Sequence, residues 1–145
     1  MDPSYFLGHP GVRRKMNRAT DWLIQASAFL GDAERSHQGQ SYYLSCFLSQ
    51  QAAEFALKSF CEFLKVRCWG HELLQIVTAL EKIKKVLIPD NIKDCCAILT
   101  KFYIGTRYPD AYTTGTPAKL FTKTESEHAI SCAKEVYAFA REEIL

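Results

Sequence analysis

The chain has 145 residues, of which 48% are hydrophobic and 23% charged, and its formal net charge is +2. This balance is typical of a soluble globular protein, and the length is that of one ordinary domain, so we expect a single domain over residues 1–145. The small charge does not by itself demand a nucleic-acid partner, and no apolar run reaches the roughly 20 residues of a membrane-spanning helix.

Residues 1–11 (MDPSYFLGHPG) have the Pro and Gly content of a leader, without the basic and apolar regions of a signal peptide. We therefore expect a cytoplasmic protein. The six cysteines contain no C-x-x-C pair, so we predict no zinc site, no other metal and no cofactor. Since cytosolic thiols stay reduced, we expect unpaired cysteines that mostly serve as small core residues.

Apolar periodicity predicts a first amphipathic helix over about residues 12–36, with a basic first turn that includes Arg18 beside Asp21. The next helix, over residues 41–65, is apolar almost all round and is predicted to be the buried centre of the fold, ended by Trp69 and Gly70. One polar line crosses it. Its members, four residues apart, are Gln50, Glu54 and Lys58.

A third helix is predicted over about residues 72–86 and a fourth from Asp90, its N-cap, to Gly105. The third helix is expected to turn these residues inward: Leu73, Val77, Leu80, Ile83 and Leu87. A capping box of Thr124 and Glu127 is predicted to start the last helix. No segment alternates like a strand, so we predict an all-α fold, an up-and-down four-helix bundle with a fifth helix.

The segment 106–122 (TRYPDAYTTGTPAKLFT) is predicted to be an irregular loop, because its Pro and Gly residues forbid a continuous helix. It carries Arg107, Tyr108, Asp110 and Tyr112, and two interpretations stay open. In one, Arg107 binds phosphate and the tyrosines stack on bases. In the other, Arg107 pairs with Glu54 or Asp110 and the rings cover the end of the bundle.

Three blocks, QQAAEFALKSF at 50–60, WGHEL at 69–73 and TRYPDAY at 106–112, precede an Ala-rich last helix. Together they resemble the HEPN domain, a helical module found beside minimal nucleotidyltransferases and at the end of sacsin. The resemblance covers about residues 13–145. It implies an all-α bundle that usually dimerises and, in many members, a metal-independent ribonuclease with an R-x4-6-H motif.

In this chain Arg107 matches the motif arginine, but Tyr112 stands where a histidine is expected. A phenol, with a pKa of about 10, replaces imidazole poorly in proton transfer near neutral pH. The other histidines offer little compensation by sequence. His71 is expected to cap a turn or pack on Trp69, His37 to face solvent in a turn, His9 to belong to the leader, and His128 to reach Arg107 only if the loop folds back.

The leading hypothesis is therefore a non-catalytic homodimeric module that works with a separately encoded nucleotidyltransferase, as in a toxin–antitoxin pair. Its ligand, a nucleotide or RNA, is expected to be bound by five residues: Arg107, Tyr108, Asp110, Glu54 and Lys58. The alternative is a toxin-like ribonuclease in which Arg107 and Tyr112 are the catalytic candidates. A third possibility is a structural interaction domain, in which Arg107→Ala costs stability and nothing else.

Overall fold

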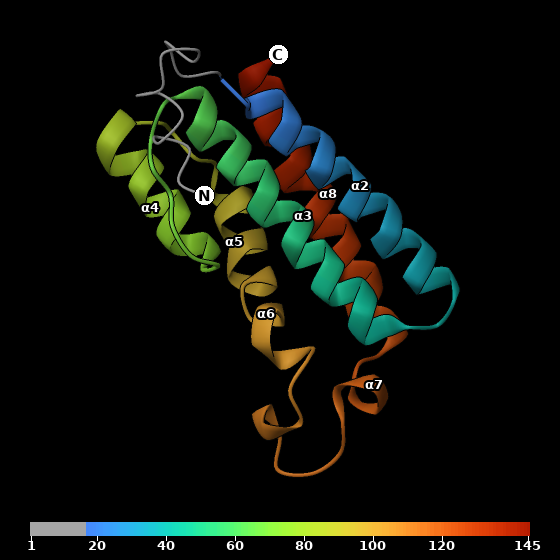
Figure 1. The fold of residues 1–145 in the computed structure, drawn as a ribbon. Coiled ribbons are helices and arrows are strands. Elements are labelled where there is room, and N and C mark those ends of the chain that lie inside the picture. Colours follow the sequence, from blue (N-terminus) through green and yellow to red (C-terminus); the bar gives the residue numbers. More distant parts are fainter. Residues whose placement is uncertain (1–16) are drawn as a thin grey trace, which may run out of the picture.

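The computed structural model describes residues 17–145, and the helices of this part form a bundle without any strand (Figure 1). In chain order the elements are α2 (Ala19–Gln38), α3 (Tyr42–Phe63), α4 (Leu73–Lys84), α5 (Asp90–Leu99), α6 (Phe102–Gly105), η1 (Pro109–Ala111), α7 (Pro117–Leu120) and α8 (Lys123–Ile144). The prediction of an all-α fold is confirmed.

Helix α3 runs through the middle, with α2 and α8 on one side and α4 and α5 on the other (Figure 1). Successive members α2, α3, α5 and α8 alternate in direction, so they form the up-and-down bundle, and α4 is the additional helix. The short turns α6, η1 and α7 hang from one end of the bundle. Among residues 17–145 no helix combines the length and the apolarity that a membrane span requires.

The buried residues of α3 are mostly small, which lets the neighbouring helices approach closely. Two of the serine hydroxyls among them donate to the backbone of α2, Ser45 Oγ to the Ala33 carbonyl at 2.8 Å and Ser59 Oγ to the Ala19 carbonyl at 2.7 Å, whereas the buried Ser49 Oγ has no hydrogen-bond partner among the described residues. These bonds satisfy hydroxyls that would otherwise be costly to bury. The centre of the fold is thus fixed by polar as well as apolar contacts.

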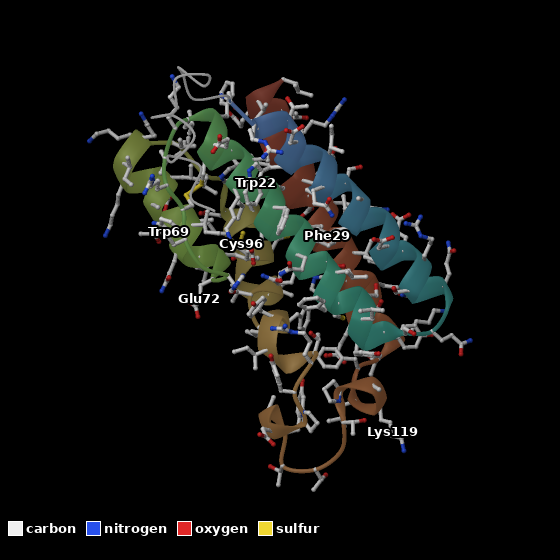
Figure 2. All side chains as sticks on the ribbon, in the orientation of Figure 1. Trp22, Phe29, Trp69, Glu72, Cys96 and Lys119 are labelled. Atoms are coloured by element: carbon white, nitrogen blue, oxygen red, sulfur yellow. A yellow bond between two sulfur atoms is a disulfide. The ribbon has the colours of Figure 1, made fainter. Side chains whose placement is uncertain are left out.

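Helix α3 ends at Phe63, earlier than the predicted stop at Trp69 and Gly70. Lys65 adopts a left-handed conformation (φ 59°), and the Val66 amide donates to the Cys61 carbonyl at 2.8 Å, which closes the helix. The chain then runs back along α3 as residues 64–72 (Figure 1). Trp69 lies in this segment and is 76% exposed (Figure 2).

Cys61 and Cys68 form a disulfide at the head of this segment, so the prediction that the cysteines are unpaired is wrong for these two (Figure 2). The reversal of the chain after α3 brings their Cα atoms to 6.4 Å, within disulfide range. The remaining cysteines are free and buried, as predicted: Cys46, Cys95, Cys96 and Cys132. Burial raises the pKa of the Cys46 thiol to about 12.

The predicted inward face of the third helix is correct for Leu73, Val77 and Leu80 but wrong for Ile83 and Leu87, which are 60% and 89% exposed. Helix α4 ends at Lys84, and Lys85 takes a left-handed conformation, so the helical period does not extend to residue 87. Asp90 is the first residue of α5 and not its N-cap.

The capping box of α8 lies two residues before the predicted one. Thr122 Oγ1 accepts from the Glu125 amide, and Glu125 Oε1 accepts from the Thr122 amide, both at 3.1 Å. At the other end of the chain, the start of the predicted first helix and His9 lie outside the described residues. Arg18 pairs with Asp21 at 3.0 Å, as the sequence suggested.

Candidate functional site

Arg107 is an exposed residue just after α6, and its guanidinium lies among three aromatic rings. Its Cζ atom is 4.3 Å from the ring centre of Tyr103, 4.7 Å from that of Phe47 and 5.1 Å from that of Tyr108. The Nε–H donates to the Tyr103 carbonyl at 2.7 Å, which fixes the base of the side chain. We call these four residues the Arg107 cluster.

A shallow surface pocket of about 530 Å³ opens beside the cluster. It is lined by Tyr103, Ile104, Arg107, Tyr108, Asp110 and Ala111. The structure thus brings the predicted site residues Arg107, Tyr108 and Asp110 to one place. Neither carboxylate proposed as a partner of Arg107 in the structural interpretation, Glu54 or Asp110, forms an ion pair with it within the described residues.

Glu54 lies in the middle of α3 and is 1% exposed. Lys58 Nζ donates to its Oε2 at 3.0 Å, and Gln50 Nε2 donates to its Oε1 at 3.1 Å. The polar line predicted on this helix is therefore a buried network around Glu54. Glu54 itself is covered, so any ligand meets it only through its neighbours.

His71 completes this network from the segment between α3 and α4. Its Nδ1 lies 3.0 Å and 3.2 Å from the two carboxylate oxygens of Glu54, and the imidazole is 47% exposed. The predicted packing on Trp69 is wrong, since the imidazole stacks instead on Tyr103, with ring centres 3.9 Å apart and planes 12° apart. The Gln50 side chain also donates to the His71 carbonyl, at 3.3 Å.

Tyr103 therefore joins the Arg107 cluster to the network around Glu54. The imidazole stacks on its ring at 3.9 Å, and the guanidinium carbon of Arg107 lies 4.3 Å from the centre of the same ring. Sequence reasoning missed Tyr103, Phe47 and this role of His71. The one signal for Tyr103 was its position four residues before Arg107, which places two side chains on one helical face.

The contacts of Tyr112 are those of a residue with a structural role. Its hydroxyl donates to the Gly105 carbonyl at 2.7 Å, and its ring packs edge-on against Phe121. Burial, with the nearby Glu125 carboxylate and the Cys46 thiol, raises the pKa of the phenol above its usual value. Tyr112 thus fastens the loop to the bundle, and no described contact joins it to Arg107.

Two further described histidines, His37 and His128, have no contact with the Arg107 cluster. His37, predicted to face solvent in a turn, is in α2, with a side chain 19% exposed and Nδ1 2.7 Å from Ser126 Oγ. His128 is exposed on α8 and has no described contact with Arg107. Within residues 17–145, no group of three His, Cys, Asp or Glu side chains is arranged to hold a metal ion.

Taken together, these features define a small α-helical module with an arginine-centred surface site at one end of its bundle. Residues 19–144 match the model of the HEPN domain, so the chain belongs to the HEPN family. This confirms the resemblance inferred from the three sequence blocks. No curated protein matches the chain.

Solved structures show the same fold. TT1696 from Thermus thermophilus is 39% identical, with a TM-score of 0.83 over 88% of this chain and 98% of its own. ST0689, an archaeal HEPN homologue, is 34% identical, with a TM-score of 0.75 over 90% of this chain and 100% of its own. A HEPN domain protein from Thermotoga maritima, at 24% identity and a TM-score of 0.66, covers 84% of this chain with 95% of its own and shows the fold alone.

Proposed function

We propose that this HEPN protein binds a phosphate-bearing ligand, a nucleotide or single-stranded RNA, at the Arg107 cluster. One observation carries the proposal: an exposed guanidinium held among three aromatic rings, beside an open pocket. A guanidinium recognises phosphate oxygens through two parallel hydrogen bonds. Aromatic faces stack on bases of any sequence, so the cluster offers partners for both parts of a nucleotide.

Asp110 and Tyr108 extend this site at the pocket wall. A carboxylate accepts hydrogen bonds from exocyclic amino groups of bases, and the exposed ring of Tyr108 offers a stacking face. Glu54 and Lys58 act behind the surface, where Glu54 holds His71 and Lys58 holds Glu54. Tyr112 serves the site only by fastening its loop.

We further propose that the protein acts in the cytoplasm as a homodimer, beside a separately encoded nucleotidyltransferase, as one half of a toxin–antitoxin-like pair. Support for this part is membership of the HEPN family alone. Sedimentation at micromolar concentration tests the homodimer, and a monomer would contradict it. Co-purification with the neighbouring nucleotidyltransferase tests the pair.

The binding proposal is tested by fluorescence anisotropy with a labelled single-stranded RNA and with labelled ATP and GTP. Arg107→Ala should weaken binding about 10- to 100-fold, because a hydrogen-bonded contact to a charged group contributes about 1.5–3 kcal/mol. Lys119→Ala is the matched control, since Lys119 is an exposed cation on α7, outside the pocket (Figure 2). It should bind like the wild type.

The third hypothesis, a structural domain without ligand, makes the opposite prediction. No ligand would bind the wild type, and Arg107→Ala would lower only the melting temperature. Because Arg107 is exposed, its contacts with the rings contribute about 0.5–1 kcal/mol each. Wild-type protein that binds neither RNA nor nucleotide would therefore refute the proposed function.

A further inference from the structure

The sequence argued against catalysis because no histidine follows Arg107 at the expected spacing. The structure brings a different histidine to the Arg107 cluster. His71 reaches it from the segment before α4, 36 positions earlier in the chain, and stacks on Tyr103 at 3.9 Å. Its imidazole is 47% exposed and therefore open to a ligand. This contact depends on the return of the chain along α3.

The hydrogen bonds of His71 fix which nitrogen is available. Nδ1 lies within 3.2 Å of both Glu54 oxygens, and a carboxylate only accepts, so Nδ1 carries its hydrogen. Nε2 then holds the lone pair in the neutral ring, and no hydrogen bond joins it to any residue between 17 and 145. An imidazole oriented by a buried carboxylate, with its second nitrogen free, is the arrangement of a general base.

Glu54 is itself held firmly. It is 1% exposed and accepts from Lys58 and Gln50 as well as facing His71. An exposed imidazole is solvated by water and needs no carboxylate partner. Burial of a carboxylate costs free energy unless hydrogen-bond partners surround it. The cost is explained if the network sets the orientation of His71.

We propose that His71 is the acid–base residue of the Arg107 site, oriented by Glu54, and that it transfers a proton of single-stranded RNA bound there. The proposal rests on the proposed function, since Arg107 must first hold the RNA. The imidazole and the guanidinium both lie against one phenol ring, at 3.9 Å and 4.3 Å from its centre. The ribose hydroxyl and the phosphate of one RNA linkage are neighbours, so a linkage bound at this ring can meet both groups.

RNA fits this pair because it contains its own nucleophile. Nε2 of His71 takes the proton of a 2′-hydroxyl as the 2′-oxygen bonds to the adjacent phosphorus, whose oxygens Arg107 binds. The bond from phosphorus to the 5′-oxygen breaks, and the 5′-oxygen takes a proton from water. The hydroxide so formed is neutralised by the proton that His71 releases. The products are a 2′,3′-cyclic phosphate and a 5′-hydroxyl.

The experiment separates cleavage from binding. Cleavage is followed in EDTA with an end-labelled single-stranded RNA, and binding is followed with the same sequence carrying 2′-O-methyl groups, which cannot react. His71→Ala should lower the cleavage rate about 10²- to 10⁴-fold, the usual contribution of a general base. Its dissociation constant should stay within about threefold of the wild type. Added imidazole should restore part of the rate, which a purely structural role would not allow.

Three further variants keep the test decisive. His128→Ala, an exposed histidine on α8, is the matched control and should cleave like the wild type. Glu54→Gln should lower the maximal rate while leaving binding of the methylated RNA unchanged, since Glu54 is a positioning residue. His71→Gln replaces His71→Ala if the smaller side chain lowers the melting temperature.

Wild-type protein that binds the methylated RNA but cleaves nothing would overturn the assignment of His71 and leave the proposed function standing. Cleavage unchanged in both His71 variants would also overturn it. If the wild type neither binds nor cleaves, both the proposed function and this inference fail.

Discussion

Replacing Lys58 with methionine removes the ammonium group that faces Glu54 and keeps an unbranched side chain that is one atom shorter. The pair lies 3.0 Å apart, with side chains 15% and 2% exposed. Breaking a buried ion pair by removal of one partner costs about 3–5 kcal/mol. Glu54 keeps its contacts with Gln50 and His71, so we expect Lys58→Met to lower the free energy of unfolding by about 2–3 kcal/mol.

The assay is urea unfolding followed by circular dichroism at 25 °C, with thermal melts beside it. For a chain of this length, 1 kcal/mol corresponds to about 2–4 °C, so the melting temperature should fall by about 5–10 °C. An exposed pair at the same spacing would cost only about 0.3–0.5 kcal/mol. A loss of unfolding free energy below about 0.5 kcal/mol would therefore refute the buried network and indicate an exposed pair.

A double-mutant cycle isolates the interaction itself. Glu54→Gln keeps the shape and removes the charge, so we expect a loss of about 1–2 kcal/mol, since a hydrogen bond to a charged group is replaced by a neutral one. The double variant Glu54→Gln with Lys58→Met should be more stable than the two single losses predict, by at least about 1 kcal/mol. Additivity within about 0.5 kcal/mol would show that the two side chains do not interact.

Three further experiments test the fold: two threonine substitutions at the start of α8, a tyrosine substitution, and labelling of the thiols. Thr122→Ala removes the observed cap of α8 and should cost about 1 kcal/mol in urea unfolding, whereas Thr124→Ala, the cap predicted from sequence, should cost less than about 0.5 kcal/mol. Tyr112→Phe removes the bond to the Gly105 carbonyl, so it should cost about 1 kcal/mol at neutral pH. The pKa of Tyr112 is raised in the folded state, so the contribution of its phenol to stability is complete below about pH 10, the unfolded value, and is lost as pH rises further. The free energy of unfolding of Tyr112→Phe should therefore fall less steeply with rising pH above about pH 10 than that of the wild type. Four free cysteines are buried and have raised thiol pKa values: Cys46, Cys95, Cys96 and Cys132. A thiol reagent at pH 8 should therefore react slowly with the native protein. After unfolding without reductant, the reagent should react readily with these four thiols. Fast reaction of the native protein would contradict their burial.

Much of the fold was predictable from apolar periodicity, because α2 and α8 each bury one face and α3 is apolar on most sides. The helix ends were less predictable. Residues 122–127 contain the pattern of a capping box twice, once from Thr122 and once from Thr124, and local sequence does not choose between them. The end of α3 was placed too late, since apolar residues continue beyond the left-handed turn at Lys65.

The site was predictable only in part, for a related reason. Arg107, Tyr108 and Asp110 are neighbours in sequence, so their meeting at one pocket needed no tertiary information. His71 lies 17 positions from Glu54 in the chain, and its contact depends on where α3 ends and how residues 64–72 return along it. Because the end of α3 was predicted a few residues too late, the contact between His71 and Glu54 was not predicted.

Substitution of both buried charges of α3, Glu54 and Lys58, distinguishes a role in function from a role in stability. Replacing a buried ion pair with apolar side chains of similar size is often neutral or stabilising, by about 1–4 kcal/mol, so the fold alone does not require Glu54 and Lys58. The double variant Glu54→Met with Lys58→Met should therefore unfold at a urea concentration equal to or above that of the wild type, although Lys58→Met alone is destabilised. If the network exists to orient His71, the same double variant should bind methylated RNA normally and cleave the unmodified RNA far more slowly. A double variant as unstable as Lys58→Met alone would show instead that the charges are needed by the fold.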